Sequence, residues 1–310
     1  MTRYIIRRLL QLVPVIIGIS IITFLMMSFV PGDPVRLMLG QHITPQAEQN
    51  VRESLGLDKP AVTRYFDYMG KVVQGDFGRS YIQHQDVSTM LKDKFPVTIK
   101  LAVVAMVIAV TIGVLIGILS AIKQYSAWDT IATVFALSGV SIPTFWLGMM
   151  LQLVFGVMLH ILPVSGTGGE GLNLQYFILP GFALGFASMA MYARLTRSSM
   201  LEVIHQDYIR TAKAKGLSGR VVIFKHAMKN ALIPVATQAG IDFGALMGGA
   251  ILTETIFALP GVGSMLFTAI SRRDYPVVQG VTLVLALIFV LVNLLVDISY
   301  AILDPRIRYD

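Results

Sequence analysis

Residues 101–122 of this chain read LAVVAMVIAVTIGVLIGILSAI, which is twenty-two positions without a charged side chain. A helix of about 20 apolar residues spans the roughly 30 Å hydrocarbon core of a bilayer, because each residue advances it by about 1.5 Å. An uncharged run of this length is typical of a membrane span, not of a helix in a soluble core. We therefore interpret this stretch as a transmembrane helix.

The composition of all 310 residues supports that interpretation. The chain is 55% hydrophobic and 14% charged, with a mean hydropathy of +0.70, whereas soluble domains are about 45–50% apolar and 25% charged. A soluble fold of this size would have to expose large apolar patches, which excludes an ordinary soluble enzyme. The sparse charge also excludes a disordered chain, and the absence of cysteine excludes a disulfide-stapled secreted fold.

Five further apolar windows are long enough to cross a membrane. We predict an all-α integral membrane protein with six transmembrane helices at residues 9–30, 101–122, 130–162, 175–193, 231–258 and 277–303. The first is interpreted as a retained anchor, since it is too long for a signal peptide and ends in Pro31-Gly32-Asp33-Pro34 without a cleavage site. The predicted parts are a cytoplasmic N-terminus and first helix (1–30), an extracytoplasmic segment (31–95) and a five-helix core (96–310).

Lys and Arg mark the cytoplasmic side of a membrane protein. With the N-terminus inside, the cytoplasmic segments carry fourteen Lys and Arg against five Asp and Glu, whereas segment 31–95 carries eight of each. Both termini are therefore expected in the cytoplasm. The net charge of +7 then reflects orientation in a lipid bilayer, and no nucleic acid is needed as a partner.

The outer segment 31–95 has ordinary charge density, so we expect it to fold. Pro45 stands at the first position of a predicted helix, and Gly56 stands where that helix would stop. Two interpretations stay open for this segment: a small cap over the helix ends, and a docking surface for a soluble partner.

The cytoplasmic loop 194–230, between the fourth and fifth predicted spans, is basic and broken into two helical pieces. Asp207 is placed to cap a short helix that Gly216 would end, and Ser218 would begin the second helix. Small side chains on the first helix would let another protein approach closely: Thr211, Ala212 and Ala214. The loop is then either a rigid lever that docks a protein or a basic segment lying on anionic lipid, and the residues leave both open.

This loop resembles the signature of permease subunits of bacterial ATP-binding-cassette (ABC) importers. That signature reads Glu-Ala-Ala, three residues and Gly, followed later by Ile-x-Leu-Pro; here the equivalents are RTAKAKG at 210–216 and Leu232-Ile233-Pro234, after a longer gap. Arg210 and Thr211 at the first two positions resemble the branch that imports oligopeptides, dipeptides, glutathione or nickel. Further stretches are similar to the first-of-pair permease of that branch: RRLL at 7–10, PGDP at 31–34, QGDFG at 74–78, ETIFALPGVG at 254–263 and LDPRIRY at 303–309.

The resemblance implies a bacterial cytoplasmic membrane protein that forms a heterodimer with a second homologous permease. It also implies two cytoplasmic ATPase subunits and an extracytoplasmic substrate-binding protein as partners. The residues implied to contact an ATPase subunit lie on the short helix of the loop: Asp207, Tyr208, Arg210, Thr211, Ala212, Lys213 and Gly216.

The chain itself lacks the features of an enzyme. It contains no Gly-x-x-x-x-Gly-Lys-Ser/Thr phosphate loop, so ATP and Mg²⁺ are expected on the ATPase partners and no cofactor on this chain. Its five histidines have no metal-ligand spacing. We therefore predict neither catalytic residues nor a metal site.

Two acids lie inside the fifth predicted span, where ionisable residues are costly and often functional. Asp242 and Glu254 are twelve residues apart, which puts them about 120° apart around the helix and on different faces. Both are candidates for the translocation pathway; Asp242 is predicted to face that route or the partner permease, the alternative being a bond to a neighbouring helix. Three glycines spaced by four form a groove for helix packing: Gly240, Gly244 and Gly248.

The predicted function is thus that of a permease subunit of an ATP-driven importer of di- or oligopeptides. The alternative is a self-sufficient secondary transporter of small polar solutes, which would need coupling-ion residues near the midplane and often an internal repeat. For such a coupling-ion site the sequence shows one candidate acid, Asp242, and no repeat. No residue selects among dipeptide, longer peptide, glutathione and nickel as substrate.

Overall fold

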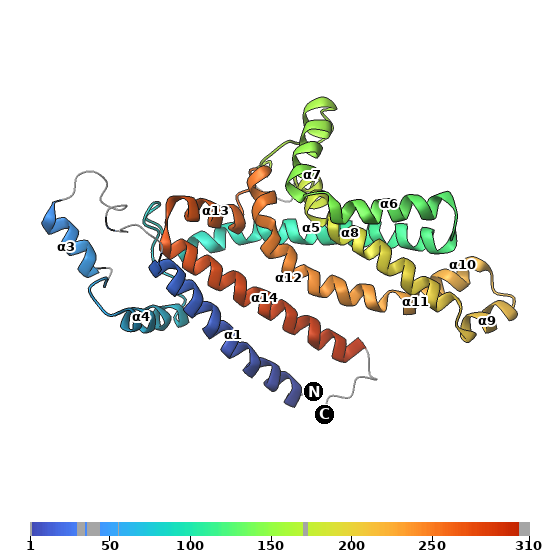
Figure 1. The fold of residues 1–310 in the computed structure, drawn as a ribbon, viewed down its shortest axis with the longest axis horizontal. Coiled ribbons are helices and arrows are strands. Elements are labelled where there is room, and N and C mark those ends of the chain that lie inside the picture. The colour runs from blue at the N-terminus through green and yellow to red at the C-terminus, as the bar shows by residue number, and fades with distance from the viewer. Residues whose placement is uncertain (1, 30–34, 36–43, 55, 170–172, 304–310) are drawn as a thin grey trace. The chain divides into compact units, whose positions relative to one another are not determined.

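A computed structural model describes residues 2–29, 35, 44–54, 56–169 and 173–303. The described residues are mainly helical (Figure 1), and their only β-structure is an isolated bridge between Arg79 and Asp86. In chain order the helices are α1 (Thr2–Phe29), α3 (Pro45–Ser54), α4 (Ala61–Val73), α5 (Val87–Ile122), α6 (Ala127–Ser141), α7 (Thr144–Leu151), the π-helix η1 (Gln152–Met158), α8 (Gln175–Ile204), α9 (Asp207–Ala214), α10 (Gly219–Val221), the π-helix η2 (Val222–Ala227), α11 (Met228–Ala231), α12 (Ile233–Ile256), α13 (Val262–Arg272) and α14 (Tyr275–Leu303).

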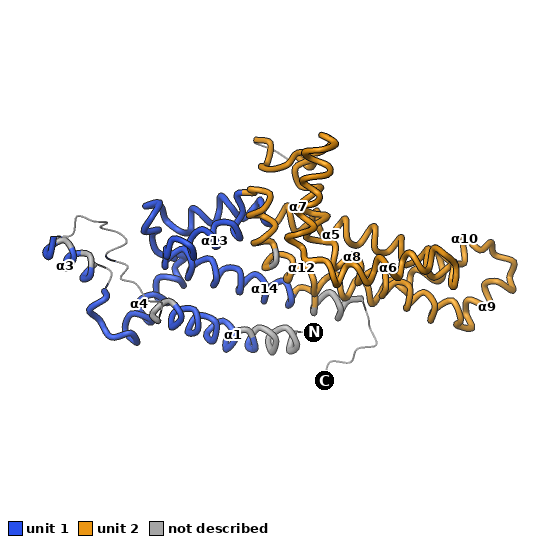
Figure 2. The backbone as a smooth tube through the Cα atoms, turned by 45° about the horizontal axis from the view of Figure 1, so that its top comes forward, with its two compact units in different colours: residues 1–98, 260–294, 308–310 blue, residues 99–259, 295–307 orange. Residues whose placement is uncertain are grey.

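Contacts group the chain into two compact units, shown in Figure 2. Unit 1 comprises residues 1–98, 260–294 and 308–310, and unit 2 comprises residues 99–259 and 295–307. The long helices α5 and α14 each contribute to both units. These units are defined by contacts within the chain and not by the sides of a membrane. The predicted boundaries at residues 30 and 95 therefore stay predictions.

The apolar helices agree with an all-α integral membrane protein. Among the described residues three helical stretches are long and apolar enough to span: α5, α8 and Tyr275–Val296 of α14. Two more spans result if each of two bent helix pairs counts as one, and the apolar part of α1, Val13–Met26, is shorter. The count of six spans therefore stays a prediction.

The third predicted span, a single helix over 130–162, is wrong in one respect. The chain bends by 110° between α6 and α7–η1. Pro143 stands at the break, and Ile142 before it is extended, with ψ of 121°. Proline disfavours the helical conformation in the residue before it, which explains why α6 ends there.

Helices α5 and α8 interlock through two pairs of glycines in unit 2. A Cβ atom on Gly117 of α5 would lie 2.5 Å from the carbonyl oxygen of Ala193, and one on Gly185 of α8 would lie 2.6 Å from the carbonyl oxygen of Ala105. Four residues before each, a Cβ on Gly113 would lie 2.6 Å from the carbonyl oxygen of Met189, and one on Gly181 would lie 2.8 Å from a methyl group of Val104. Small residues at this spacing allow close packing in lipid, where no hydrophobic force drives helices together.

The glycines predicted to form a packing groove lie on α12. A Cβ on Gly240 would meet the methyl groups of Val296 at 2.8 Å, and Gly244 is buried. Gly248 is exposed, and no described atom beyond its own surroundings lies within 4 Å of its Cβ position. The groove is therefore filled at one end within unit 2 and open at the other.

Unit 1 packs the outer segment against α1. Ser20 and Tyr65 share a hydrogen bond of 2.7 Å between their hydroxyl oxygens, and the Phe24 and Tyr65 rings meet edge to face. As predicted, α3 begins at Pro45 and the chain turns after it at Gly56, where φ is +64°. The predicted helix stop at 31–34 and the motif at 304–309 lie outside the described residues.

Candidate functional site

The short helix predicted in the cytoplasmic loop is confirmed as α9. It begins one residue earlier than predicted: Gln206 precedes the helix and Asp207 is its first residue, so the predicted cap at Asp207 is wrong. The Asp207 carboxylate instead lies 3.5 Å from the Arg210 guanidinium, one turn further along. The helix ends where predicted, since Gly216 adopts φ of +77°, a conformation that glycine tolerates best.

One face of α9 is anchored in unit 2. Ile209 is fully buried and Ala212 is 6% exposed. Both belong to a hydrophobic cluster with residues of α5, α8 and the helix that follows α9: Ile118, Ala121, Met200, Val222, Ala227 and Ala231. An isolated helix of eight residues is unstable in water, so this burial is what holds α9 in place.

The opposite face of α9 is exposed. Of the residues predicted to contact a partner, all but one are exposed: Asp207, Tyr208, Arg210, Thr211, Lys213 and Gly216. Ala212 is the exception, because its side chain faces the chain's own cluster. Asn230 donates a hydrogen bond of 2.9 Å to the Tyr208 hydroxyl and so holds that ring at the surface.

The helical segment α10–η2, which follows α9 in the chain, extends this exposed face, since η2 packs directly against α9. Figures 1 and 2 place α9 and α10 together at one end of unit 2. We define the α9 surface as the exposed basic and apolar residues of these elements: Tyr208, Arg210, Lys213, Lys215, Leu217, Arg220, Val221, Phe224 and Lys225. Apolar side chains surrounded by cations suit a protein partner that carries acidic residues.

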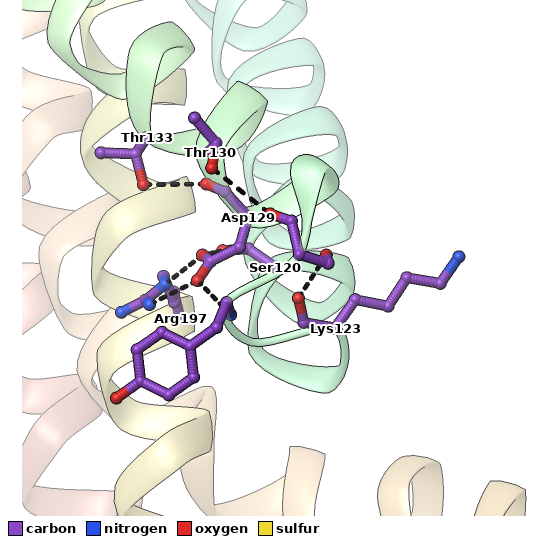
Figure 3. A network of polar contacts seen from close by, with 8 residues as sticks. Ser120, Lys123, Asp129, Thr130, Thr133 and Arg197 are labelled. Atoms are coloured by element: carbon purple, nitrogen blue, oxygen red, sulfur yellow. Dashed lines mark hydrogen bonds and ion pairs between the residues drawn. The ribbon is translucent and has the colours of Figure 1, made fainter.

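A second polar site, absent from the sequence predictions, joins the end of α5, the start of α6 and the C-terminal half of α8 (Figure 3). The Asp129 side chain is almost fully buried, and the Arg197 guanidinium donates to both of its carboxylate oxygens, with Nε–Oδ1 at 2.7 Å and Nη2–Oδ2 at 2.8 Å. The Ser120 hydroxyl and the Tyr125 backbone N–H donate to the same carboxylate. A bidentate pair of this kind fixes orientation as well as distance.

Asp242 lies at the contact between α12 and α8. The Tyr192 hydroxyl donates to its Oδ2 at 2.9 Å, and the Gln238 amide donates to its Oδ1 at 2.8 Å. The bond to a neighbouring helix that the sequence left open is therefore present. Its place in a translocation pathway stays a prediction.

Glu254 is fully buried near the C-terminal end of α12. Close to it in the chain, the Ile256 carbonyl accepts a hydrogen bond of 3.0 Å from the side-chain amide of Gln152 in η1, which also donates to the Val164 carbonyl. The Gly166 N–H donates to the Phe257 carbonyl at 2.9 Å. The loop after η1 is thus fastened to the end of α12, and Glu254 lies beneath this end and not on an open surface.

Unit 1 contains a small cavity of about 170 Å³, whose polar and charged lining residues include Lys94, Ser264, Thr268 and Arg272. Pockets for small molecules usually measure about 300–1,000 Å³, so this cavity is smaller than a typical ligand pocket. No cluster of three or more His, Asp or Glu side chains that could hold a metal occurs in the described part of the chain.

Near this cavity, Asp274 fixes the loop before α5. Its carboxylate accepts hydrogen bonds from the Ser80 hydroxyl and the Tyr81 backbone N–H. Burial and, to a smaller extent, the negative charge of Asp274 raise the pKa of Tyr81 to about 12. The phenol is therefore neutral at physiological pH.

Comparison with known proteins places nearly the whole chain in one group. Residues 113–309 match the family model "Binding-protein-dependent transport system inner membrane component", and residues 1–102 match its N-terminal counterpart. The chain is 46% identical to the dipeptide transport system permease protein DppB of Alkalihalophilus pseudofirmus, with all of both chains covered.

Two further comparisons agree. The chain is 42% identical to the glutathione transport system permease protein GsiC of Escherichia coli K12, again over the full length of both. Among solved structures, an inward-facing form of the MetNI methionine ABC transporter superposes with a TM-score of 0.57 at 17% identity, covering 69% of this chain and 96% of that one. This similarity shows a shared fold.

Proposed function

This chain belongs to the family of binding-protein-dependent transport system inner membrane components, and from that premise we propose that it forms one half of a pathway for small peptides. It is a permease subunit of a peptide-type ABC importer. In the proposal a second, homologous permease forms the other half. Two cytoplasmic ATPase subunits bind ATP and Mg²⁺, an extracytoplasmic binding protein delivers the peptide, and this chain catalyses no reaction.

The α9 surface is the observation that carries the proposed ATPase contact. Ile209 and Ala212 anchor α9 from within, so a force applied to its outer face reaches α5 and α8 through their shared cluster. The outer face itself is basic and partly apolar, with Tyr208 and Phe224 exposed by 40% and 53%. A lever of this kind can couple closure of two ATPase subunits to a change in the membrane helices.

The substrate class rests on the relatives. They are named as permeases for dipeptides, for di- and tripeptides and for glutathione, which is itself a tripeptide. The shared chemistry of these substrates is a short peptide with charged ends. We therefore propose di- and oligopeptides as cargo, with selection among them made largely by the binding protein.

The proposed orientation places α9 and both termini in the cytoplasm of a bacterial cell, with the protein in the cytoplasmic membrane. The excess of Lys and Arg in loop 194–230 supports this side, because basic loops are retained in the cytoplasm. The described outer segment, from α3 to the start of α5, then faces the binding protein.

Co-purification of the chain with its ATPase subunits tests the proposal. Arg210→Glu reverses the charge of a side chain that is 79% exposed on α9. We expect this variant to weaken ATPase capture by about tenfold, equivalent to about 1.4 kcal/mol. Lys71→Glu makes the same charge change on α4 in unit 1 and is the matched control. Equal ATPase capture by the wild type and the Arg210→Glu variant would contradict the α9 contact.

A further inference from the structure

The Asp129–Arg197 ion pair makes more hydrogen bonds than an exposed ion pair beside a turn would make. Each carboxylate oxygen of Asp129 accepts two hydrogen bonds: Oδ1 from Arg197 Nε and the Ser120 hydroxyl, Oδ2 from Arg197 Nη2 and the Tyr125 N–H. Figure 3 shows Arg197 and Ser120 beside the Asp129 carboxylate. The carboxylate is therefore fully hydrogen-bonded, although Asp129 as a whole is only 6% exposed.

The backbone of the α5–α6 turn is shaped to complete this site. Tyr125 adopts φ of +60°, which non-glycine residues rarely adopt. In that conformation its N–H points at Asp129, 3.0 Å from Oδ2. The turn, the end of α5 and the start of α6 are thus tied to one guanidinium on α8.

The pair lies next to the anchor of α9. Ser120 is flanked on α5 by Ile118 and Ala121, and Met200 follows Arg197 by one turn on α8. These three flanking residues belong to the cluster that buries Ile209. The polar site and the α9 anchor are therefore carried by the same segments of α5 and α8.

A hydrophobic contact at this place would stabilise the fold equally well, because buried ion pairs are often no more stabilising than apolar residues of similar volume. The glycine pairs already hold α8 close to α5, but an apolar contact would not fix the α5–α6 turn and the start of α6 in one orientation against α8. A carboxylate that is held by a bidentate guanidinium and by two further donors allows the helices that carry these groups only one register and one rotation.

We propose that Asp129 and Arg197 are positioning residues for coupling: they make α5, the start of α6 and α8 move together when α9 is displaced. The inference rests on the proposed function, since it concerns how the ATPase stroke reaches the membrane helices. Without the pair, α9 would still dock on the ATPase subunit, but its displacement would no longer move the start of α6 together with α8.

The test uses the complete importer in proteoliposomes, with ATPase subunits, second permease, binding protein and a dipeptide. Asp129→Asn and Arg197→Gln each remove one charge. We expect assembly and ATP hydrolysis to persist while dipeptide imported per ATP falls at least about fivefold, the lower end of typical coupling effects. Ser126→Ala is the matched control, because that hydroxyl bonds the Lys123 carbonyl in the same turn and does not touch Asp129.

A double variant separates positioning from stability. Asp129→Leu with Arg197→Met replaces the pair by apolar side chains, which should preserve folding and assembly. If the pair positions the helices, import per ATP stays low in this variant. Recovery of wild-type coupling would overturn the proposal, as would failure of all three variants to assemble, because either result assigns the pair a purely structural role.

ATP-driven uptake by the wild-type complex distinguishes failure of the proposed function from failure of the positioning role. If the wild-type complex shows no ATP-driven uptake, the proposed function fails. If the wild type imports dipeptide and the Asp129 and Arg197 variants import the same amount per ATP, only the positioning role fails.

Discussion

Replacing Ile209 by alanine should detach α9 without unfolding the rest of unit 2. Ile209 is fully buried in the cluster that anchors α9. The change removes three carbons, and at about 0.8 kcal/mol for each buried group the loss is about 2.4 kcal/mol before any cavity term. Ile→Ala replacements in protein cores cost about 2–5 kcal/mol, so 2.4 kcal/mol is near the lower limit.

The expected effect is local because α9 has eight residues and cannot remain helical without its anchor. A loss of 2.4 kcal/mol raises the equilibrium constant for opening about 50-fold, since each 1.4 kcal/mol is a factor of ten. Amide hydrogen exchange across residues 207–216 of the reconstituted complex should accelerate by that factor. ATP-driven uptake should fall in parallel.

Thr211→Ala is the matched control for Ile209→Ala. Thr211 is exposed on the same helix, and its hydroxyl donates only to the Asp207 carbonyl of its own helix. Exchange in α9 should therefore change little. Unchanged exchange in the Ile209→Ala variant would refute the anchoring role, and a uniform acceleration over residues 99–259 would refute local detachment.

Three further predictions address packing, the membrane core and pH. Gly117→Ala should destabilise the purified protein by about 1–3 kcal/mol, because the new Cβ would overlap the Ala193 carbonyl, whereas Gly248→Ala, at an open position, should leave the thermal midpoint of the isolated chain unchanged. Asp242→Leu should impair uptake while leaving assembly intact, and Asp242→Asn, which keeps an acceptor, should impair it less; normal uptake by the leucine variant would exclude a pathway role. Because the pKa of Tyr81 is raised to about 12, only the unfolded state ionises this phenol between pH 10 and 12, so stability should decline over that interval and decline less in Tyr81→Phe.

The local features of the fold could be predicted from sequence because their signals are local. Uncharged windows located the apolar parts of α5 and α8, but the charged start of α5 (87–100) and the charged end of α8 (194–204) were placed outside the helices. Gly216 located the end of α9 through its left-handed conformation. The start of α9 was misplaced by one residue because Gln206, and not the better capping residue Asp207, precedes the helix.

Two features had signals in the sequence that were weighted wrongly. Pro143 lies inside the third apolar window, and its effect on Ile142 breaks the predicted span. Glycines spaced by four also occur at 113 and 117 and at 181 and 185, and it is these pairs that allow α5 and α8 to approach closely. Spacing alone does not say which glycine face meets a helix.

The Asp129–Arg197 site had no such signal. The two residues are 68 positions apart, and both stand at the edges of apolar windows, where charges usually face water. The burial of Ala212 was missed for a related reason: a small residue on a short helix fits an interface and an internal contact equally well. Both features depend on how α5, α6 and α8 pack, which local patterns do not determine.

The most direct test of the central claim is dipeptide uptake into proteoliposomes by the complete complex and by this chain alone. We expect uptake to require ATP, both permeases, the ATPase subunits and the binding protein, and this chain alone to transport nothing under a proton or sodium gradient. Gradient-driven uptake of dipeptide by this chain alone would contradict the claim and would establish the secondary-transporter alternative.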